Sequence, residues 1–356
     1  LGGTRPLQGR ALRRGDWNNY APRVGIAWSP DQKTSARIGY GLFYDSSRDF
    51  QGPSSLTFTP PYSVTYTANG IQFSDPYLGQ VNPFPYEPPD TQQERDSYTF
   101  FRPVRAESVG EDKGGGYSHQ WNLNVQREIA ARIVLTAAYV GTSGVKMPLR
   151  REINPAIYRP GATLANRQQR RIYPEFQSIT EMDPVGKSLY HGIELSANKR
   201  FSHGYTIVAN YTYGRARDNE SSDSGGGQDP LNLSDNWGYS DTNVKHRLVT
   251  SFLWQLPSPE KGLAKAVLGG WQFNGIVTLS SGTPFTVSSG RDTMLSFINS
   301  RANVVGDPDL PTDRPRSEVV AMYFDPAAFA IPSEGALGNS VRNFLSGPGT
   351  KKADLS

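Results

Sequence analysis

The sequence predicts an all-β fold, an antiparallel transmembrane β-barrel with short periplasmic turns and long extracellular loops. Eight segments alternate apolar and polar residues, their connections alternate between short and long, and aromatic residues gather near both ends of the segments. Successive side chains of a strand point to opposite faces, so a strand that faces lipid on one side is apolar at every second position. Together these features are typical of a barrel wall.

The eight predicted strands are joined alternately by short and long connections. In chain order they are Pro22–Ser29, Thr34–Tyr44, Tyr117–Ile129, Ile133–Val140, Leu189–Phe201, Tyr205–Tyr213, Arg247–Leu256 and Gly270–Ser281. Short connections are expected at Pro30–Lys33, Ala130–Arg132, Ser202–Gly204 and, somewhat longer, Pro257–Gly269. Long loops are expected at Asp45–Gly116, Gly141–Ser188 and Gly214–His246. Compact soluble domains rarely contain so much chain outside helices and strands, whereas outer-membrane barrels place such loops outside the cell.

The alternation assigns one face of every strand to lipid. In order along the chain, the predicted lipid-facing residues are Val24, Ile26 and Trp28; Ile38, Tyr40, Leu42 and Tyr44; Trp121, Leu123 and Val125; Ile133, Leu135, Ala137 and Tyr139; Ile193, Leu195, Ala197 and Phe201; Tyr205, Ile207, Ala209, Tyr211 and Tyr213; Leu248, Thr250, Phe252, Trp254 and Leu256; and Trp271, Phe273, Gly275, Val277 and Leu279. The opposite face carries Arg37, Asn122, Asn124, Gln126, Glu194, Ser196, Asn198, Arg200, Thr206, Asn210, Thr212, Arg247, Gln272 and Asn274. A polar inner face predicts a wet or plugged lumen.

Aromatic placement gives an independent indication, because Trp and Tyr favour the two membrane interfaces. Those that flank the short connections are Trp28, Phe201, Tyr205, Trp254 and Trp271, and those at the far ends are Tyr44, Tyr139, Tyr211 and Tyr213. The competing interpretation is a soluble antiparallel sandwich or propeller whose aromatics pack a core. Such folds space their strands about 8 to 12 residues apart, so the long loops favour the barrel.

Composition restricts the chemistry available to the chain. It has no Cys, which removes disulfides, redox CxxC motifs and thiolate zinc sites. Its four His residues, His119, His191, His203 and His246, are not spaced as metal ligands, and no nucleophile elbow is present. We therefore expect no enzyme, no cofactor and no metal site. No run of about 18 uncharged apolar residues occurs that could form a membrane-spanning helix.

Two groups of charged residues have a functional and a simpler interpretation. Asp218, Glu220, Asp223 and Asp229 lie in a Gly- and Ser-rich loop that could bind calcium, but they lack EF-hand spacing, and a solvated loop is favoured. The net charge of +4 is spread over loops, and nucleic-acid binding is not expected because that would need one packed basic surface. Solvated loop charge, with attraction to lipopolysaccharide phosphates, is expected for Arg13, Arg14, Arg150, Arg151, Arg170 and Arg171.

Several stretches, in order along nearly the whole chain, resemble the barrel of TonB-dependent transporters of the Oar-like type that carries a carboxypeptidase regulatory-like domain. They are PRVGIAWSP followed by RIGYGLFYD, HQWNLNVQREI followed by VLTAAYVGTSG, YHGIELSANKRFSHGYTIVANYTYGRARDN, VKHRLVTSFLWQLP, LGGWQFNGIVTLSSGTPFTV, and FDPAAFAIPSEGALGNSVRNFLSGPGTKKADLS. The resemblance implies one barrel domain of the class in which 22 strands surround a plug. It also implies that residues 1–356 are part of this domain, with the plug, the TonB box and the final strands outside the sequence. From the residues themselves, the sequence is expected to stop at Ser356 just after a long loop rather than at the end of a strand.

The resemblance implies energised uptake of a bulky solute across the outer membrane of a Gram-negative bacterium. The partners expected are outer-membrane lipid and lipopolysaccharide, the TonB complex through the N-terminal region, and a solute of unknown identity. A structural or adhesive surface barrel and a passive porin remain open. Candidate ligand contacts are the loop aromatics Phe58, Tyr62, Tyr66, Phe84, Tyr86, Tyr98 and Phe101, and the alternative is that they pack the loop against itself.

Overall fold

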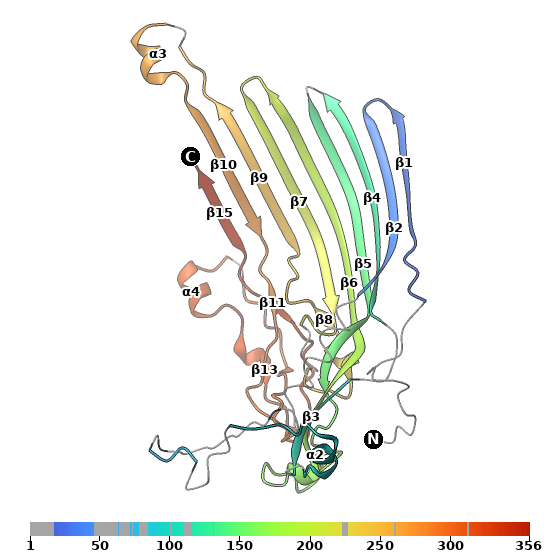
Figure 1. Cartoon of the computed structure of the whole chain (residues 1–356). Coiled ribbons are helices and arrows are strands. Elements are labelled where there is room, and N and C mark those ends of the chain that lie inside the picture. The colour runs from blue at the N-terminus through green and yellow to red at the C-terminus, as the bar shows by residue number, and fades with distance from the viewer. Residues whose placement is uncertain are drawn as a thin grey trace.

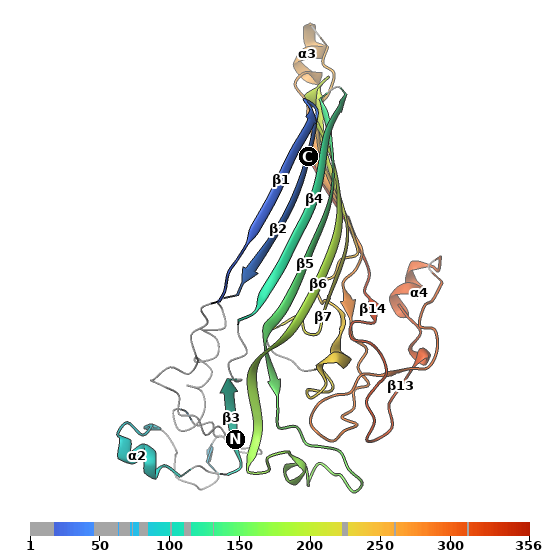
Figure 2. The same cartoon turned by 90° about the vertical axis from the view of Figure 1, so that its right-hand side faces the viewer.

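The computed structural model describes residues 18–45, 63, 72, 74–77, 85–99, 102–109, 115–130, 132–222, 227–259, 261–311 and 313–356. One curved, open antiparallel sheet dominates it, with short turns at one end and long loops at the other (Figures 1 and 2). None of the helices in these ranges has the length and hydropathy of a membrane span.

Nine strands form the continuous path of this sheet, in the order β1-β2-β4-β5-β6-β7-β9-β10-β15. Each neighbouring pair along the path is antiparallel. Their bounds are β1 Arg23–Asp31, β2 Thr34–Tyr44, β4 Tyr117–Ala130, β5 Ile133–Glu152, β6 Phe176–Ser202, β7 Tyr205–Asp218, β9 His246–Gln255, β10 Gln272–Ser280 and β15 Thr350–Leu355.

The hairpins at the short-turn end follow from local backbone preferences. Between β6 and β7, His203 and Gly204 both have positive φ, at 54° and 80°, and Ser202 pairs directly with Tyr205. Two central residues in the left-handed region match the right-handed twist of the flanking strands. All eight predicted strands are present, with the second matching at both ends and the others shifted mainly at their ends.

Three strands are longer than the sequence pattern predicts. The hairpin of β5 and β6 continues beyond the predicted Gly141–Ser188 loop boundary until Glu152 pairs with Thr180, and β7 extends to Asp218. Parts of the long loops that we expected to be irregular therefore carry regular strand pairing. Above the membrane, water solvates both faces of a strand, so the apolar alternation that marks a lipid-facing segment is lost there.

The prediction that the sequence stops after a loop rather than at the end of a strand is wrong. Residues Thr350–Leu355 form β15, which pairs with β10 from Ser280↔Thr350 to Gly275↔Leu355. This strand is short, and three of its six residues, Lys351, Lys352 and Asp354, are charged. Its strand conformation comes from the backbone partners that β10 supplies, which the local sequence does not reveal.

The register confirms the predicted separation into an apolar and a polar face. Ile26 pairs with Ile38, Ile38 with Leu123, and Leu123 with Tyr139. On the other face, Arg37 pairs with Asn124. Because the apolar side chains share one side across all the strands and remain exposed in the isolated chain, this side is the lipid-facing surface.

The remaining elements are short, and most lie in the connections at the long-loop end. Helix α3 (Gly262–Leu268) occupies the β9–β10 connection at the short-turn end (Figure 1), where we expected a turn. Strand β3 (Val104–Val109) is a parallel addition to the outer part of β6. The others are α2 (Gln92–Ser97), η1 (Gln168–Arg170), η2 (Leu233–Asn236), β8 (Gly238–Tyr239), β11 (Pro284–Phe285), β12 (Asn303–Val304), α4 (Arg316–Ala321), η3 (Pro326–Ala328), β13 (Phe329–Ala330) and β14 (Leu345–Ser346).

The two ends of the sheet give a topology prediction for the full-length protein in intact cells. A Ser222→Cys variant, at the long-loop end, should react with a membrane-impermeant maleimide from outside. His203→Cys and Gln32→Cys, in two of the short turns, should react only after the outer membrane is permeabilised. Residues 1–356 contain no Cys, and labelling of the full-length protein without the introduced Cys gives the background signal. If the turn variants were labelled before Ser222→Cys, the sheet would have the opposite orientation in the membrane.

The two edges of the sheet give a second prediction. Among the described residues, β1 pairs only with β2 and β15 only with β10, so each has one unpaired backbone edge. In lipid, unpaired backbone groups cost several kcal/mol each. Residues 1–356 expressed alone should therefore aggregate or be degraded. A protease-resistant monomer whose electrophoretic mobility changes on heating would show instead that this chain closes by itself.

Candidate functional site

At the long-loop end, three connections pack together into a cap, which we define as the described residues of 153–175, 219–245 and 282–349. The buried side chains of the cap are mostly polar or charged rather than apolar. Burying such groups is unfavourable unless they are hydrogen-bonded. The shape of the cap therefore depends on how its arginines and amides are paired.

Arg342 is the centre of the largest group of contacts. Its side chain is 8% exposed and forms an ion pair with Asp218 at the end of β7, whose side chain is 9% exposed. It also donates from Nη1 to Asp241 Oδ1 at 3.1 Å and from Nε to the Asn236 carbonyl at 3.1 Å. One guanidinium thus joins the end of a barrel strand to the 227–245 and 282–349 segments.

Arg301 and Gln228 make a second connection between the same two segments. Arg301 Nη2 donates to Asp235 Oδ2 at 2.6 Å, and its backbone N–H donates to Gln228 Oε1 at 2.9 Å. The Gln228 amide nitrogen donates in turn to the Gly338 carbonyl at 2.8 Å. Both side chains are buried, so the bonds of Gln228 lie away from water, where a hydrogen bond is electrostatically stronger.

The 153–175 segment is held by Arg170, which is 4% exposed. Its guanidinium donates to the carbonyls of Ile157 at 2.9 Å and Leu295 at 2.6 Å, so it also contacts the 282–349 segment. Arg171 is similarly enclosed, and burial lowers the pKa of its guanidinium while Glu152 opposes that shift. The interpretation of Arg151, Arg170 and Arg171 as solvated loop charge is therefore wrong, and Arg13 and Arg14 lie outside the described residues.

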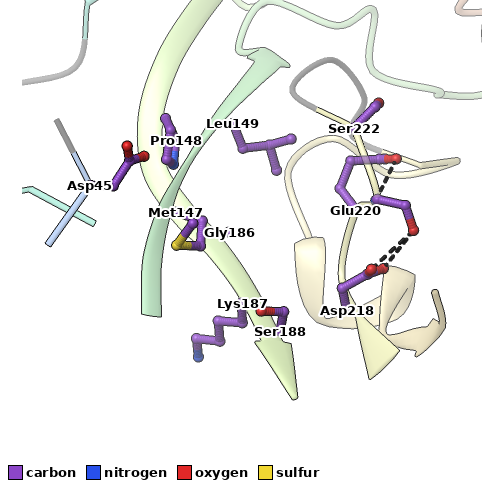
Figure 3. Close-up of a pocket in the computed structure, with 11 residues that line it drawn as sticks. Asp45, Met147, Pro148, Leu149, Gly186, Lys187, Ser188, Asp218, Glu220 and Ser222 are labelled. Carbon is purple, nitrogen blue, oxygen red and sulfur yellow. Dashed lines mark hydrogen bonds between the residues drawn. The ribbon is translucent and has the colours of Figure 1, made fainter. Parts of the chain in front are cut away.

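A cavity of 360 Å³ lies between the end of β7 and the outer part of the β5–β6 hairpin (Figure 3). Ser188 and Asp218, which pair across β6 and β7, belong to the inward-facing set of positions, so the cavity opens on the luminal side of the sheet. Asp218, Glu220 and Ser222 lie on one side, and the apolar Met147, Pro148 and Leu149 lie on the other together with Asp45 (Figure 3). The lining consists of Asp45, Met147, Pro148, Leu149, Gly186, Lys187, Ser188, Asp218, Glu220, Ser221 and Ser222.

A second cavity, of 210 Å³, lies between the 219–245 and 282–349 segments of the cap and shares Glu220 with the first. Arg301 and Arg342 line it together with amides and hydroxyls, including Asn236 and Ser300. The two cavities therefore present hydrogen-bonding groups of both charge signs. Such a surface fits a polar solute better than an apolar one.

The acidic cluster considered for calcium is not assembled in the described residues. Asp218 is paired with Arg342, and Asp229 accepts a hydrogen bond from the Leu231 backbone at 3.0 Å. Asp223 lies outside the described residues. Across the described ranges, no group of three or more His, Asp and Glu side chains is placed to hold a metal ion.

Of the predicted ligand-contacting aromatics, Tyr86 and Tyr98 are described, and they lie together on either side of α2. Tyr86 donates a hydrogen bond to the Tyr98 hydroxyl at 3.2 Å, and burial together with this bond raises the pKa of Tyr86 to about 12. The contact suits packing within the loop as well as a ligand platform, so the role of the pair stays a prediction. Phe58, Tyr62, Tyr66, Phe84 and Phe101 lie outside the described residues.

The functional side chains that sequence reasoning missed are Arg301, Arg342, Gln228 and Asn236. Their contacts join residues far apart in the chain, and no local period marks them. The only signal available was indirect, namely that these polar residues occur in loops too long to be simple connections.

Comparison with protein families agrees with this architecture. The model of a family described as an outer membrane beta barrel domain matches residues 2–356. The chain belongs to this outer-membrane β-barrel domain family. Its location is accordingly the outer membrane of a Gram-negative bacterium, as the sequence predicted. A comparison with curated proteins finds no match.

Solved structures similar to this barrel chain include outer-membrane transporters. The outer membrane transporter YddB from Escherichia coli has 11% sequence identity and a TM-score of 0.43, over 80% of this chain and 32% of that one. The FrpB iron transporter from Neisseria meningitidis has 11% identity and a TM-score of 0.40, over 79% and 30%. The ferric-catecholate import receptor Fiu from E. coli has 9% and 0.38, over 79% and 27%. The barrel chain thus spans about a third or less of the length of these proteins.

Proposed function

We propose that this barrel chain forms part of the wall of a TonB-dependent transporter that imports a bulky polar solute through a plugged lumen, and that it does not act as an enzyme. The observation that carries the proposal is the openness of the sheet. Nine strands lie side by side and β1 and β15 remain at opposite edges, although eight strands suffice to close a small barrel. An open sheet of this many strands suits a barrel wide enough to hold a plug.

The sequence resemblance to Oar-like transporters supports the same proposal, and so does the cap. Its arginines hold three connections in place around cavities lined by polar groups, an arrangement suited to solute capture before transport. The candidate contacts are Tyr86 and Tyr98 together with the cavity lining. Nothing in this chain identifies the solute.

Planar-bilayer conductance of the full-length protein tests the proposal without knowledge of the solute. A plugged transporter should show almost no basal conductance, and deletion of the plug should open a large pore. The full-length protein should also bind the purified periplasmic domain of TonB. High conductance of the intact protein would establish a passive porin, and low conductance without TonB binding would establish a structural or adhesive barrel.

A further inference from the structure

Three Tyr–His pairs repeat across the lipid-facing side of the sheet. They join β2 to β4, β5 to β6, and β7 to β9, and in each the tyrosine hydroxyl lies within hydrogen-bond distance of histidine Nδ1. The pairs are Tyr40–His119 at 2.8 Å, Tyr139–His191 at 2.7 Å and Tyr211–His246 at 2.8 Å.

The pairs share one geometry. Directly opposite the three tyrosines lie Trp121, Ile193 and Leu248, and each histidine precedes one of these residues by two positions, toward the long-loop end. A two-residue step keeps the histidine on the same face as the residue it precedes. All six side chains of the pairs therefore face outward, among the residues that contact lipid.

The three histidines lie at one depth in the membrane. His191 lies two residues nearer the short-turn end than the β6 residue that the register aligns with His119 on β4. His246 on β9 lies in turn two residues nearer that end than the position aligned with His191. Each step crosses two strands, about 9.6 Å, while two residues span about 6.7 Å. This ratio corresponds to a strand tilt of about 35°, which is the ordinary tilt of membrane barrels. A further step of the same size ends at Lys351 on β15.

A second row marks the opposite membrane boundary. Eight residues after the three histidines along their strands come Arg127, Lys199 and Trp254. Lys199 bends to the neighbouring turn, where Nζ donates to Ser202 Oγ at 2.7 Å. Eight residues span about 27 Å along a strand and about 22 Å along the membrane normal at this tilt, close to the height of about 25 Å of an outer-membrane apolar band. The histidines therefore lie at the headgroups of the outer leaflet.

The chemistry of this row suits an anion. When the phenol donates to Nδ1, the neutral imidazole carries its hydrogen on Nε2, and within the described part of the chain no hydrogen bond from that atom is found. Arg215 is the direct cross-strand partner of His191, and Tyr213 lies between Arg215 and His246. Among the described outward positions within two residues of this row, none is Asp or Glu, and the outward Asp31 lies far from it at the short-turn end, where it pairs with Arg127. The row thus presents donors and positive charge without an opposing carboxylate.

We propose that the patch formed by His191, Arg215 and His246, continued along the same depth by His119 and Lys351, binds the phosphate groups of the outer-leaflet glycolipid, lipid A. Histidine Nε2–H and the Arg215 guanidinium donate to the phosphate oxygens, and the tyrosines hold the imidazoles in the orientation required. Charge-assisted hydrogen bonds of this kind are stronger than neutral ones. The proposal requires only the outer-membrane location and the orientation of the sheet, and it does not depend on transport.

The test compares lipid bound to the full-length protein after extraction from outer membranes in mild detergent, measured by native mass spectrometry. The variant His191→Phe, Arg215→Gln, His246→Phe keeps aromatic bulk but removes the donors. The matched control is Arg247→Gln, which removes the same charge next to His246 but from the inward face. We expect about tenfold less bound lipid A in the triple variant and no change in the control. The heat-dependent electrophoretic mobility of each protein verifies that it is folded.

Exchange of the delipidated wild-type protein into nanodiscs identifies the source of the phosphate. We expect retention of bisphosphorylated lipid A and loss of binding with its dephosphorylated form. Equal retention of phosphatidylglycerol would overturn the assignment to glycolipid. Equal amounts of bound lipid A in the triple variant and the control would overturn the site itself. If the triple variant fails to fold, Arg215→Gln and His191→Phe are tested singly, and binding unchanged in both would likewise refute it.

Discussion

Replacing Leu195 with Arg in the full-length protein should prevent or strongly impair barrel assembly. Leu195 lies on the lipid-facing side of β6, four residues from His191 and four from Lys199, so it is at the middle of the apolar band. An arginine there would have to reach about 13 Å along the strand to either boundary, which is longer than its side chain. The expected cost is about 2 to 4 kcal/mol.

The matched variant Ser196→Arg should assemble normally, because Ser196 faces the polar side between Thr136 and Asn210. The amount of folded barrel in the outer membrane, measured by heat-dependent electrophoretic mobility, compares the two. A denaturant titration in lipid vesicles gives the free energies of unfolding. If both variants assembled equally well, the assignment of the lipid-facing side would be wrong.

Replacing Arg342 with Ala should loosen the cap while leaving the barrel strands intact. The change leaves the buried Asp218 carboxylate without its charge partner and removes the bonds to Asp241 and Asn236. Breaking one side of a buried ion pair costs about 3 to 5 kcal/mol. Hydrogen exchange should therefore rise in the 227–245 and 282–349 segments, and external protease should cleave them faster on intact cells.

Two further variants separate this effect from a general loss of positive charge. Arg316→Ala removes an exposed arginine of α4 and should leave exchange and cleavage unchanged. Combining Asp218→Asn with Arg342→Ala should restore part of the protection, because the unpaired buried charge is then absent. Cleavage of Arg342→Ala at the wild-type rate would show that the cap does not depend on this ion pair.

The barrel wall could be predicted from the sequence because apolar and polar side chains alternate along each strand. This two-residue period is visible in neighbouring residues of one strand alone. Ile26, Ile38 and Leu123 already indicated their common face before any pairing was known, and the register places them side by side. The His203–Gly204 hairpin was likewise a local property of its turn residues. The strands above the membrane and β15 have no such period, so only their partners in the sheet give them their conformation.

The candidate site and the membrane-boundary row depend on contacts between distant parts of the chain. Arg342 and Asp218 are 124 positions apart, and nothing near either residue indicates the other. His119 resembled an ordinary isolated histidine because its partner, Tyr40, lies 79 positions away and comes beside it only when β2 pairs with β4. The two-residue period of the sequence specified which strand faces are apolar. The pairing of strands and the packing of loops decided which polar groups are in contact. Those contacts require long segments of chain to close into loops, and no local sequence preference encodes such closure.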